Sequence, residues 1–316
     1  MRFRPLGKSG MVVSTISLAL TDRAAVARPS DWVALIYAAF ENGINAFEVH
    51  GDTPGMIDGL SQAISAVDRR LVYIAWRVGT RIGTAGAVVR DFSAGALCRI
   101  VDGVLARSSL GYLDAVVLDD PQTHEFSPQA LDQLKLMRAD GRTRMLGVAG
   151  QDDAMDALLT TGAFDVLYLP YSLISGWTER RRLRTAVERD MGIIGYDYYP
   201  KNFHGAAGAA PKQSNSWLRP TRGAAPLASP RPNSPLAGAG TYDFLNRTRN
   251  WTPEEICLAH ALTEPSLSSV QIYAERAERI EALAAIPDKE MPPGVSAQIE
   301  MARFSAVGQD RKARGA

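Results

Sequence analysis

Short apolar runs alternate with helical patterns along most of this chain. The extended runs are rich in Val, Ile and Leu throughout, which is typical of parallel strands covered by helices on their outer face. The expected strands are residues 11–20, 44–48, 71–79, 113–120, 144–150, 164–171, 193–199 and 266–274. The expected helices are residues 30–43, 55–67, 94–111, 127–141, 152–162, 178–192, 252–264 and 275–286. Eight strand–helix units in 316 residues predict an α/β fold, a single closed (β/α)8 or TIM barrel over residues 1–316, rather than an open sheet.

Cap and turn residues support several of these boundaries. Ser30 and Ser127 stand where helix N-caps are expected, and Gly43 and Gly141 stand where helices are expected to stop. No G-x-G-x-x-G opens a helix after the first strand, which argues against a dinucleotide-binding Rossmann fold.

One segment, residues 201–240, interrupts the pattern with a composition rich in Ala, Pro, Gly and Ser. It has no Asp or Glu, and its basic residues are Lys201, Lys212, Arg219, Arg222 and Arg231. This composition predicts a long flexible loop after the seventh strand. Its one-sided charge and Trp217 favour a protein-docking arm over an inert linker. The polar tail, residues 302–316, is also expected to be flexible.

The overall charge is nearly balanced, with 35 basic and 34 acidic residues. This balance indicates neither a nucleic-acid partner nor a membrane partner. No apolar run is long enough for membrane insertion, and the N-terminus lacks the apolar core of a signal peptide. The two cysteines, Cys98 and Cys257, fit a reducing cytoplasm and fall on apolar helix faces, where we expect core positions. The run TERRRLR (178–184) is expected to be a solvated helix face.

Motifs in chain order resemble the aldo-keto reductase family. The opening RPLGKSGMVVSTISLAL resembles the family's N-terminal hairpin and first strand, and GINAFE resembles its second strand. Further matches are IAWRVG, LGYLDAVVLDDP, GRTRMLGVAG, FDVLYLPYSLI and MGIIGYDYYP for the third to seventh strands. The resemblance covers nearly the whole chain except residues 201–250. It implies a barrel with an N-terminal hairpin, and in the family such barrels reduce carbonyls with NADPH.

The family's catalytic residues are an Asp, a Tyr, a Lys and a His, and all four positions differ here. They are Glu48, Thr53, Arg77 and Asp119, in that order, and no tyrosine lies between Tyr37 and Tyr73. Threonine is far too weak an acid to replace the tyrosine that gives the proton, and arginine keeps its own proton. A carboxylate at the histidine position has the wrong charge to stabilise a developing oxyanion. The resemblance therefore implies a lost catalytic tetrad.

The cofactor positions that the resemblance implies are only partly kept. The groups that hold the nicotinamide amide in the family correspond to Ala149, Gly150 and Tyr168, and the stacking ring corresponds to Tyr198. The groups for the adenosine 2′-phosphate and the adenine correspond to Tyr273, Ala274, Arg279 and Leu283, with Arg276 nearby. Because the Lys-Ser pair for the 2′-phosphate is replaced, NAD(H) is expected to bind in preference to NADP(H).

Three functions remain open at this point. The first is a non-catalytic regulatory module that binds a protein partner, such as a cell-division or signalling protein, and responds to NAD(H). The chain resembles the KidO-type cell-division regulators of alphaproteobacteria in this respect. The second is a repurposed non-redox enzyme that uses Glu48, Asp119 and Arg77, with His50 and Asp52 close by. The third is an unorthodox NAD(P)-dependent oxidoreductase. The missing tyrosine favours the first, and no metal-ligand spacing supports a metal site.

Overall fold

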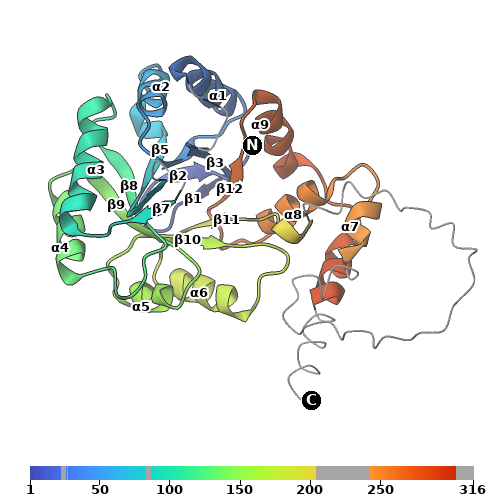
Figure 1. The fold of residues 1–316 in the computed structure, drawn as a ribbon. Coiled ribbons are helices and arrows are strands. Elements are labelled where there is room, and N and C mark those ends of the chain that lie inside the picture. Colours follow the sequence, from blue (N-terminus) through green and yellow to red (C-terminus); the bar gives the residue numbers. More distant parts are fainter. Residues whose placement is uncertain (23–25, 27, 83–86, 204–241, 304–316) are drawn as a thin grey trace, which may run out of the picture.

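The centre of the protein is a closed barrel of eight parallel strands inside a ring of helices (Figure 1). The computed structural model describes residues 1–22, 26, 28–82, 87–203 and 242–303. In order around the barrel the strands are β10 (Val166–Pro170), β11 (Gly192–Tyr196), β12 (Ser269–Tyr273), β3 (Ile16–Thr21), β4 (Ala46–His50), β5 (Tyr73–Val78), β8 (Leu113–Asp119) and β9 (Thr143–Ala149). Because β9 also pairs with β10, the sheet closes on itself, and the predicted (β/α)8 fold is confirmed.

Helices follow the strands and cover the outside of the barrel (Figure 1). They are α1 (Pro29–Glu41), α2 (Pro54–Ile64), α3 (Ala94–Arg107), α4 (Pro128–Ala139), α5 (Ala154–Thr160), α6 (Trp177–Glu188), α7 (Phe244–Arg247), α8 (Pro253–Leu262) and α9 (Ala277–Ala284). Short 3-10 turns occur at η1 (Arg69–Leu71), η2 (Lys201–Phe203) and η4 (Ile286–Asp288), and residues 295–303 are helical. One large apolar cluster fills the layer between helices and strands, and a smaller one fills the barrel interior.

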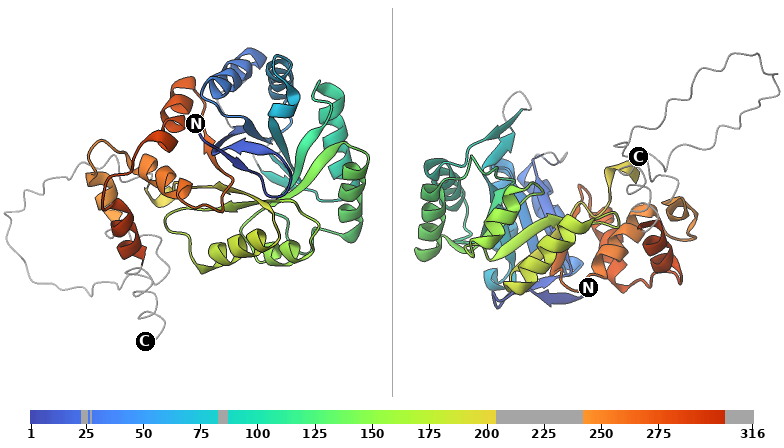
Figure 2. Two further views of the ribbon diagram at one scale, coloured as in Figure 1. Left: turned by 180° about the vertical axis from the view of Figure 1, so that it is seen from behind. Right: turned by 90° about the horizontal axis from the view of Figure 1, so that it is seen from below.

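An N-terminal hairpin closes the amino end of the barrel (Figure 2). Its strands β1 (Phe3–Pro5) and β2 (Val12–Ser14) pair antiparallel, and Leu6 is buried in the interior cluster. Gly7 has φ +52°, and a Cβ at this position would lie 2.4 Å from the backbone nitrogen of Gly192 at the start of β11. Only glycine allows so close an approach in this conformation. The expected hairpin is therefore confirmed, and the opposite end of the barrel is left open.

A second hairpin, which the sequence patterns do not predict, rises from the carboxyl end of the barrel. It consists of β6 (Thr80–Ile82) and β7 (Val88–Arg90), directly after β5. Arg90 anchors it by donating to both carboxylate oxygens of Glu125, each at 2.7 Å, and to the carbonyl oxygen of Asp120 at 2.5 Å. Strands of three residues carry too little periodicity to be recognised, so the hairpin depends on these tertiary contacts.

Three of the four expected helix boundaries are confirmed. The Ser127 hydroxyl accepts the Ala130 backbone N–H at 3.2 Å, and Gly43 and Gly141 have φ of +76° and +84° directly after the helix ends. The expectation for Ser30 is wrong, because Pro29 occupies the first helical turn and Arg28 is the N-cap. Proline is well suited to that first position, since its fixed φ matches the helix and no backbone N–H is needed there.

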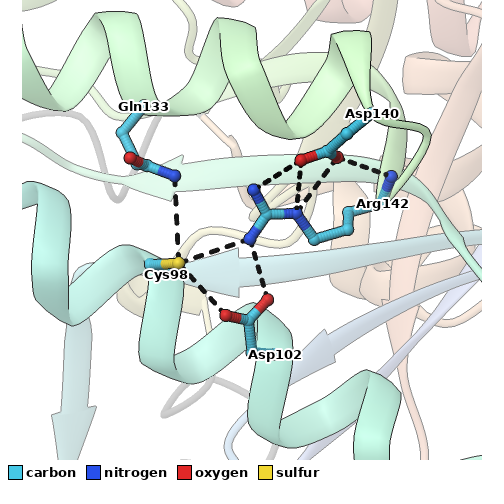
Figure 3. Close-up of polar contacts among 5 residues, drawn as sticks. All are labelled: Cys98, Asp102, Gln133, Asp140 and Arg142. Carbon is cyan, nitrogen blue, oxygen red and sulfur yellow. Dashed lines mark hydrogen bonds and ion pairs between the residues drawn. The ribbon is translucent and has the colours of Figure 1, made fainter.

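The expected core position is confirmed for Cys257, which is fully buried. It is confirmed only in part for Cys98, which packs against the edge of the core and also has polar partners (Figure 3). Cys98 is half-buried on α3, where its thiol donates to Asp102 at 3.1 Å and accepts from Arg142 at 3.3 Å. Arg142 also pairs with Asp140 at 2.7 Å. This polar cluster joins α3 to the turn between α4 and β9, so the face of α3 that carries Cys98 is not apolar there.

The expected solvated face of TERRRLR is correct for Arg180, Arg181 and Arg184 and wrong for Arg182. The Arg182 side chain is buried and donates to Asp156 at 3.0 Å. It also donates to the carbonyl oxygens of residues 151 and 152, which precede α5. Arg182 thus fastens α6 to α5, a contact between two helices that a charge count along one helix does not show.

Most of the basic loop predicted over residues 201–240 lies outside the described residues, which resume at residue 242. Most of the tail, residues 304–316, also lies outside them, so flexibility of both segments stays a prediction. Among the described helices, none has the length and apolar character needed to cross a membrane. The described part of the chain contains no cluster of three or more His, Cys, Asp or Glu side chains that could hold a metal ion.

Candidate functional site: a charged cavity at the barrel mouth

A cavity of about 1210 Å³ opens where the barrel strands end, next to the β6–β7 hairpin and α9. Enzymes with this barrel place their chemistry at this end, because the loops that follow the strands converge there. Side chains at the ends of β3, β4, β5, β8, β11 and β12 line it. The structure therefore provides a large concave site at the expected end of the fold.

Three of the four tetrad positions meet in one buried ion network at the base of this cavity. Glu48 on β4, Arg77 on β5 and Asp119 on β8 come from adjacent strands. The Arg77 Nε donates to Glu48 Oε1, and Nη1 donates to Asp119 Oδ1 at 2.5 Å. The exposed fraction of the side chain is 2% for Glu48, 9% for Arg77 and 24% for Asp119, so water screens these contacts weakly.

Further polar groups complete the network. The Gln271 amide on β12 donates to Glu48, and the Thr80 hydroxyl on β6 donates to Asp119. The His50 Nε2 lies 3.3 Å from Glu48 Oε1. The Glu48 carboxylate therefore has partners on both oxygens. Within the described part of the chain, three atoms of these side chains, His50 Nε2, Arg77 Nη2 and Gln271 Oε1, are buried and have no hydrogen-bond partner.

The network holds its carboxylates ionised. Burial is the largest influence and raises the pKa of Glu48 and of Asp119, but Arg77 and His50, with the Thr80 hydroxyl at Asp119, together outweigh it, so both pKa values lie below their usual range. The two carboxylates raise the pKa of Arg77 well above its ordinary value in spite of its burial. None of these three groups is tuned toward the neutral range in which general acids and bases exchange protons.

These shifts predict that the fold loses stability in acid. A carboxyl whose pKa is depressed by folding contributes stability above its unfolded pKa and loses it as the pH falls through the folded pKa. The free energy of unfolding should therefore decline as the pH falls below about 4, the usual range of free Asp and Glu. Urea unfolding between neutral pH and about pH 3 measures this. A variant with Glu48→Gln, Arg77→Met and Asp119→Asn should decline less steeply, and equal slopes would contradict the assignment.

The residue at the tyrosine position caps a helix beside the cavity. Thr53 is the N-cap of α2, and its hydroxyl donates to Asp22 Oδ1 at 2.8 Å. Gly51 has φ +129°, and a Cβ there would lie 1.9 Å from Asp22 Oδ2, so the loop wraps closely around this carboxylate. Thr53 is exposed and is not among the residues that line the cavity. Its hydroxyl cannot take the place of a catalytic phenol.

Two tyrosines do line the cavity, Tyr196 at the end of β11 and Tyr273 at the end of β12. Burial raises the pKa of both phenols above the ordinary value, and the lowering effect of Arg77 does not cancel it. Each is therefore a weaker acid than tyrosine in water. A carbonyl reductase needs the opposite shift, because its phenol must release a proton near neutral pH.

The expected cofactor positions separate into two groups. Tyr273, Arg276 and Arg279 line the cavity, as does Ala274. Tyr198 lies instead in the core, and its hydroxyl donates to Glu254 at 2.8 Å.

Tyr168 is also buried, with its hydroxyl 3.0 Å from that of Tyr73, and Leu283 is a core residue. Tyr196, rather than Tyr198, lines the cavity. The strand β11 ends at Tyr196, and Asp197 follows it in the left-handed region with φ +51°, so the alternation of the strand does not continue to Tyr198.

The cavity fits the phosphate end of a dinucleotide better than the nicotinamide end. Arg81, Lys201 and Arg276 line it, and none of them forms an ion pair with another described residue. The backbone N–H groups at the start of α9 would add donors to a bound phosphate. At the other end, Ala149 and Gly150 offer no side-chain donor for a carboxamide. A bound nicotinamide cofactor would supply the hydride for reduction, and Arg276 and Lys201 would hold its phosphates.

Arg279 is already engaged. Its Nη2 donates to Glu254 Oε1 at 2.6 Å, and its Nε donates to the carbonyl oxygen of Tyr273 at 3.0 Å. The Arg279 guanidinium therefore already forms an ion pair with the Glu254 carboxylate at the start of α8, and a bound 2′-phosphate would have to compete with that carboxylate.

Several residues of the site were missed from the sequence. Gln271 carried a usable signal, because a polar side chain in the middle of an apolar strand must find a buried partner. Asp22, directly after β3, carried the same kind of signal at a strand end. Thr80 and Tyr196 carried none, since their places depend on the unpredicted hairpin and on where β11 ends.

Comparison with known proteins agrees with this architecture. Solved structures similar to this chain include the holo form of the aldo-keto reductase AKR11C1 from Bacillus halodurans, with a TM-score of 0.73 and 15% sequence identity over 96% of each chain. The glycerol dehydrogenase AKR11B4 from Gluconobacter oxydans gives 0.72 and 15%, again over 96% of each chain. A putative aldo-keto reductase from Pseudomonas aeruginosa gives 0.64 and 17%, over 90% of this chain and 93% of the other. These similarities show the shared fold.

A search of curated proteins gave no match. The sequence profile described as the Aldo/keto reductase family matches residues 18–303, a span that includes the whole ion network. The chain belongs to the aldo/keto reductase family.

Proposed function

We propose that this chain is a non-catalytic aldo/keto reductase that binds NAD(H) and acts as a regulatory protein-binding module, in the manner of KidO-type cell-division regulators. The observation that carries the proposal is the direction of the tyrosine pKa shifts at the site, which is opposite to the one that catalysis in this family requires. Where the family needs a phenol made more acidic, the tyrosines that line this cavity have raised pKa values. The residue at the proton-donor position, Thr53, does not itself line the cavity, and its hydroxyl is bound to Asp22, which does.

The ion network supports the same conclusion. In the family a lysine and an aspartate lower the pKa of the catalytic tyrosine, whereas here Arg77 is bound by two carboxylates that use its charge. Two carboxylates and one guanidinium leave the trio with a net charge of −1. A negative site opposes the charge that develops on a carbonyl oxygen during reduction.

Binding without turnover would let the protein report the redox state of a cofactor pool. A ligand shifts a conformational equilibrium only by its different affinity for the two states, and that requires no chemistry. The protein partner, and the basic loop 201–240 as its docking arm, remain part of this proposal.

The proposal is tested by measuring binding and turnover on one preparation. NADH should bind, as seen by cofactor fluorescence, while aldehydes, ketones and quinones should cause no NADH oxidation above background. Arg276→Ala should weaken NADH binding, because it removes an unpaired cation from the cavity wall. Arg99→Ala, an exposed arginine on α3, should leave binding unchanged. Robust turnover that disappears with Tyr196→Phe or Glu48→Gln would contradict the proposal.

One contact favours a second candidate, non-redox proton transfer by the repurposed site. His50 lines the cavity, and its buried Nε2 lies 3.3 Å from Glu48 Oε1 without forming a hydrogen bond. A carboxylate next to an imidazole is an arrangement that general bases use. A screen of hydrolysable and dehydratable substrates tests it. Turnover that is lost with His50→Gln would establish this candidate, and a screen without turnover would remove it.

A further inference from the structure

A groove on the outer wall of the barrel lies apart from the cavity at the mouth. It has a volume of about 550 Å³, and its lining residues are all different from those of the mouth cavity. On one side it is lined by α6, through Arg180, Leu183, Arg184 and Val187. On the other side it is lined by α8, the turn after α8 and the helical residues 295–303.

One residue that lines the groove carries an unsatisfied polar group. The Nε2 atom of His260, on α8, is buried and has no hydrogen-bond partner in the part of the chain that the structure describes. Buried side-chain polar atoms usually have a partner, so this nitrogen is a position where a bound molecule would complete a hydrogen bond. Arg303 donates to the carbonyl oxygen of Ser175 at 3.0 Å and ties the far wall to the segment before α6.

The rim of the groove has excess positive charge. Arg180 and Arg184 are exposed, and neither forms an ion pair with another described residue. The acidic groups of the groove are already engaged. Glu264 accepts from the Tyr171 hydroxyl at 3.2 Å, and Glu300 accepts from Arg303 at 2.9 Å. An incoming carboxylate would therefore meet two available guanidinium groups.

Exposed apolar side chains extend this surface along α6. Trp177 is 72% exposed, the highest value among the large apolar side chains in the described residues. Residues 177, 180, 184 and 187 follow helical spacing and share one face of α6. The Arg181 guanidinium lies 4.9 Å from the centre of the Trp177 ring and holds it against the helix. Tryptophan and arginine together are the residue types most enriched in binding hot spots.

We infer that this groove docks an extended acidic segment of a protein partner, with an apolar side chain placed between Leu183 and Val187. The inference rests on the proposed regulatory role and names the chemistry of its partner. The parts of this chain outside the described residues have the wrong charge to fill the groove. Residues 204–241 contain no Asp or Glu, and residues 304–316 contain three basic residues and one acidic residue. A lipid surface would meet Arg180 and Trp177 but would not reach the recessed His260.

The test is fluorescence anisotropy with the full-length chain and a labelled peptide of about twelve residues, in which glutamates surround a central Leu-Phe pair. The peptide should bind, and added salt should weaken it. Arg180→Glu combined with Arg184→Glu should lower the affinity by roughly tenfold or more, and Trp177→Ala by roughly fivefold. The matched control, Arg99→Glu with Arg249→Glu, makes the same change in charge at two exposed arginines elsewhere and should change the affinity by less than about twofold.

Four results would overturn the inference. They are no peptide binding, equal weakening by the control pair, equal binding of a peptide with lysines in place of the glutamates, and binding to phosphatidylserine vesicles through the same arginines. Sedimentation adds one more, because a wild-type dimer that dissociates with Arg180→Glu and Arg184→Glu would mean that a second copy occupies the groove. NADH titration of this variant separates the two proposals. It should match the wild type, since the groove shares no residue with the mouth cavity.

Discussion

Replacing Arg77 by methionine is expected to destabilise the protein by about 3–5 kcal/mol. The change leaves two carboxylates, Glu48 and Asp119, next to each other without their shared cation, and Glu48 is almost completely buried. Each buried carboxylate then has to be protonated or lose its hydration without compensation. Urea unfolding of both proteins at neutral pH measures the difference.

An exposed arginine provides the control for this variant. Arg70 pairs with Asp68 at 2.8 Å, but its side chain is 79% exposed, so Arg70→Met should change the stability little. Adding Glu48→Gln and Asp119→Asn to Arg77→Met should recover much of the loss, because no buried charge is then left unpaired. If Arg77→Met is no more harmful than Arg70→Met, the network is not a unit of the folded structure.

Replacing Glu254 by glutamine is expected to raise the affinity for NADPH by roughly tenfold, with little change for NADH. In the wild type, Glu254 holds Arg279 at 2.6 Å, so a 2′-phosphate has to displace a carboxylate from its guanidinium. Glutamine keeps an oxygen for the Tyr198 hydroxyl and removes the charge that binds Arg279. The wild type should therefore prefer NADH, and the variant should lose most of that preference.

The measurement is a pair of fluorescence titrations with NADH and NADPH on each variant. Glu278→Gln is the matched control, because Glu278 is an acidic residue that lines the cavity but forms no ion pair with Arg279. An equal gain in NADPH affinity from Glu278→Gln would mean that general charge, and not the contact with Arg279, sets the selectivity. Tighter binding of NADPH than NADH by the wild type would contradict the expected preference for NADH.

Much of the fold was predictable because it depends on local patterns. Short stretches of sequence show which strands are apolar on both faces, which segments have apolar residues at helical spacing, and where helices stop, as at Gly43 and Gly141. Together these local patterns predicted the closed barrel. The absence of a tyrosine at the expected proton-donor position was also visible in the sequence, since no tyrosine stands between Tyr37 and Tyr73. A residue that is absent from the sequence cannot be restored by folding.

What the remaining side chains do together was decided only by tertiary structure. Gln271 and Glu48 meet across 223 residues of sequence, because closing the barrel brings β12 and β4 to either side of β3. The end of β11 determines that Tyr196, and not Tyr198, lines the cavity, and the Thr53 hydroxyl is held by Asp22, which follows a different strand. Local propensity and periodicity describe neighbours along the chain. Which charges pair, and therefore which pKa values shift, depends on strand register and on contacts between distant elements.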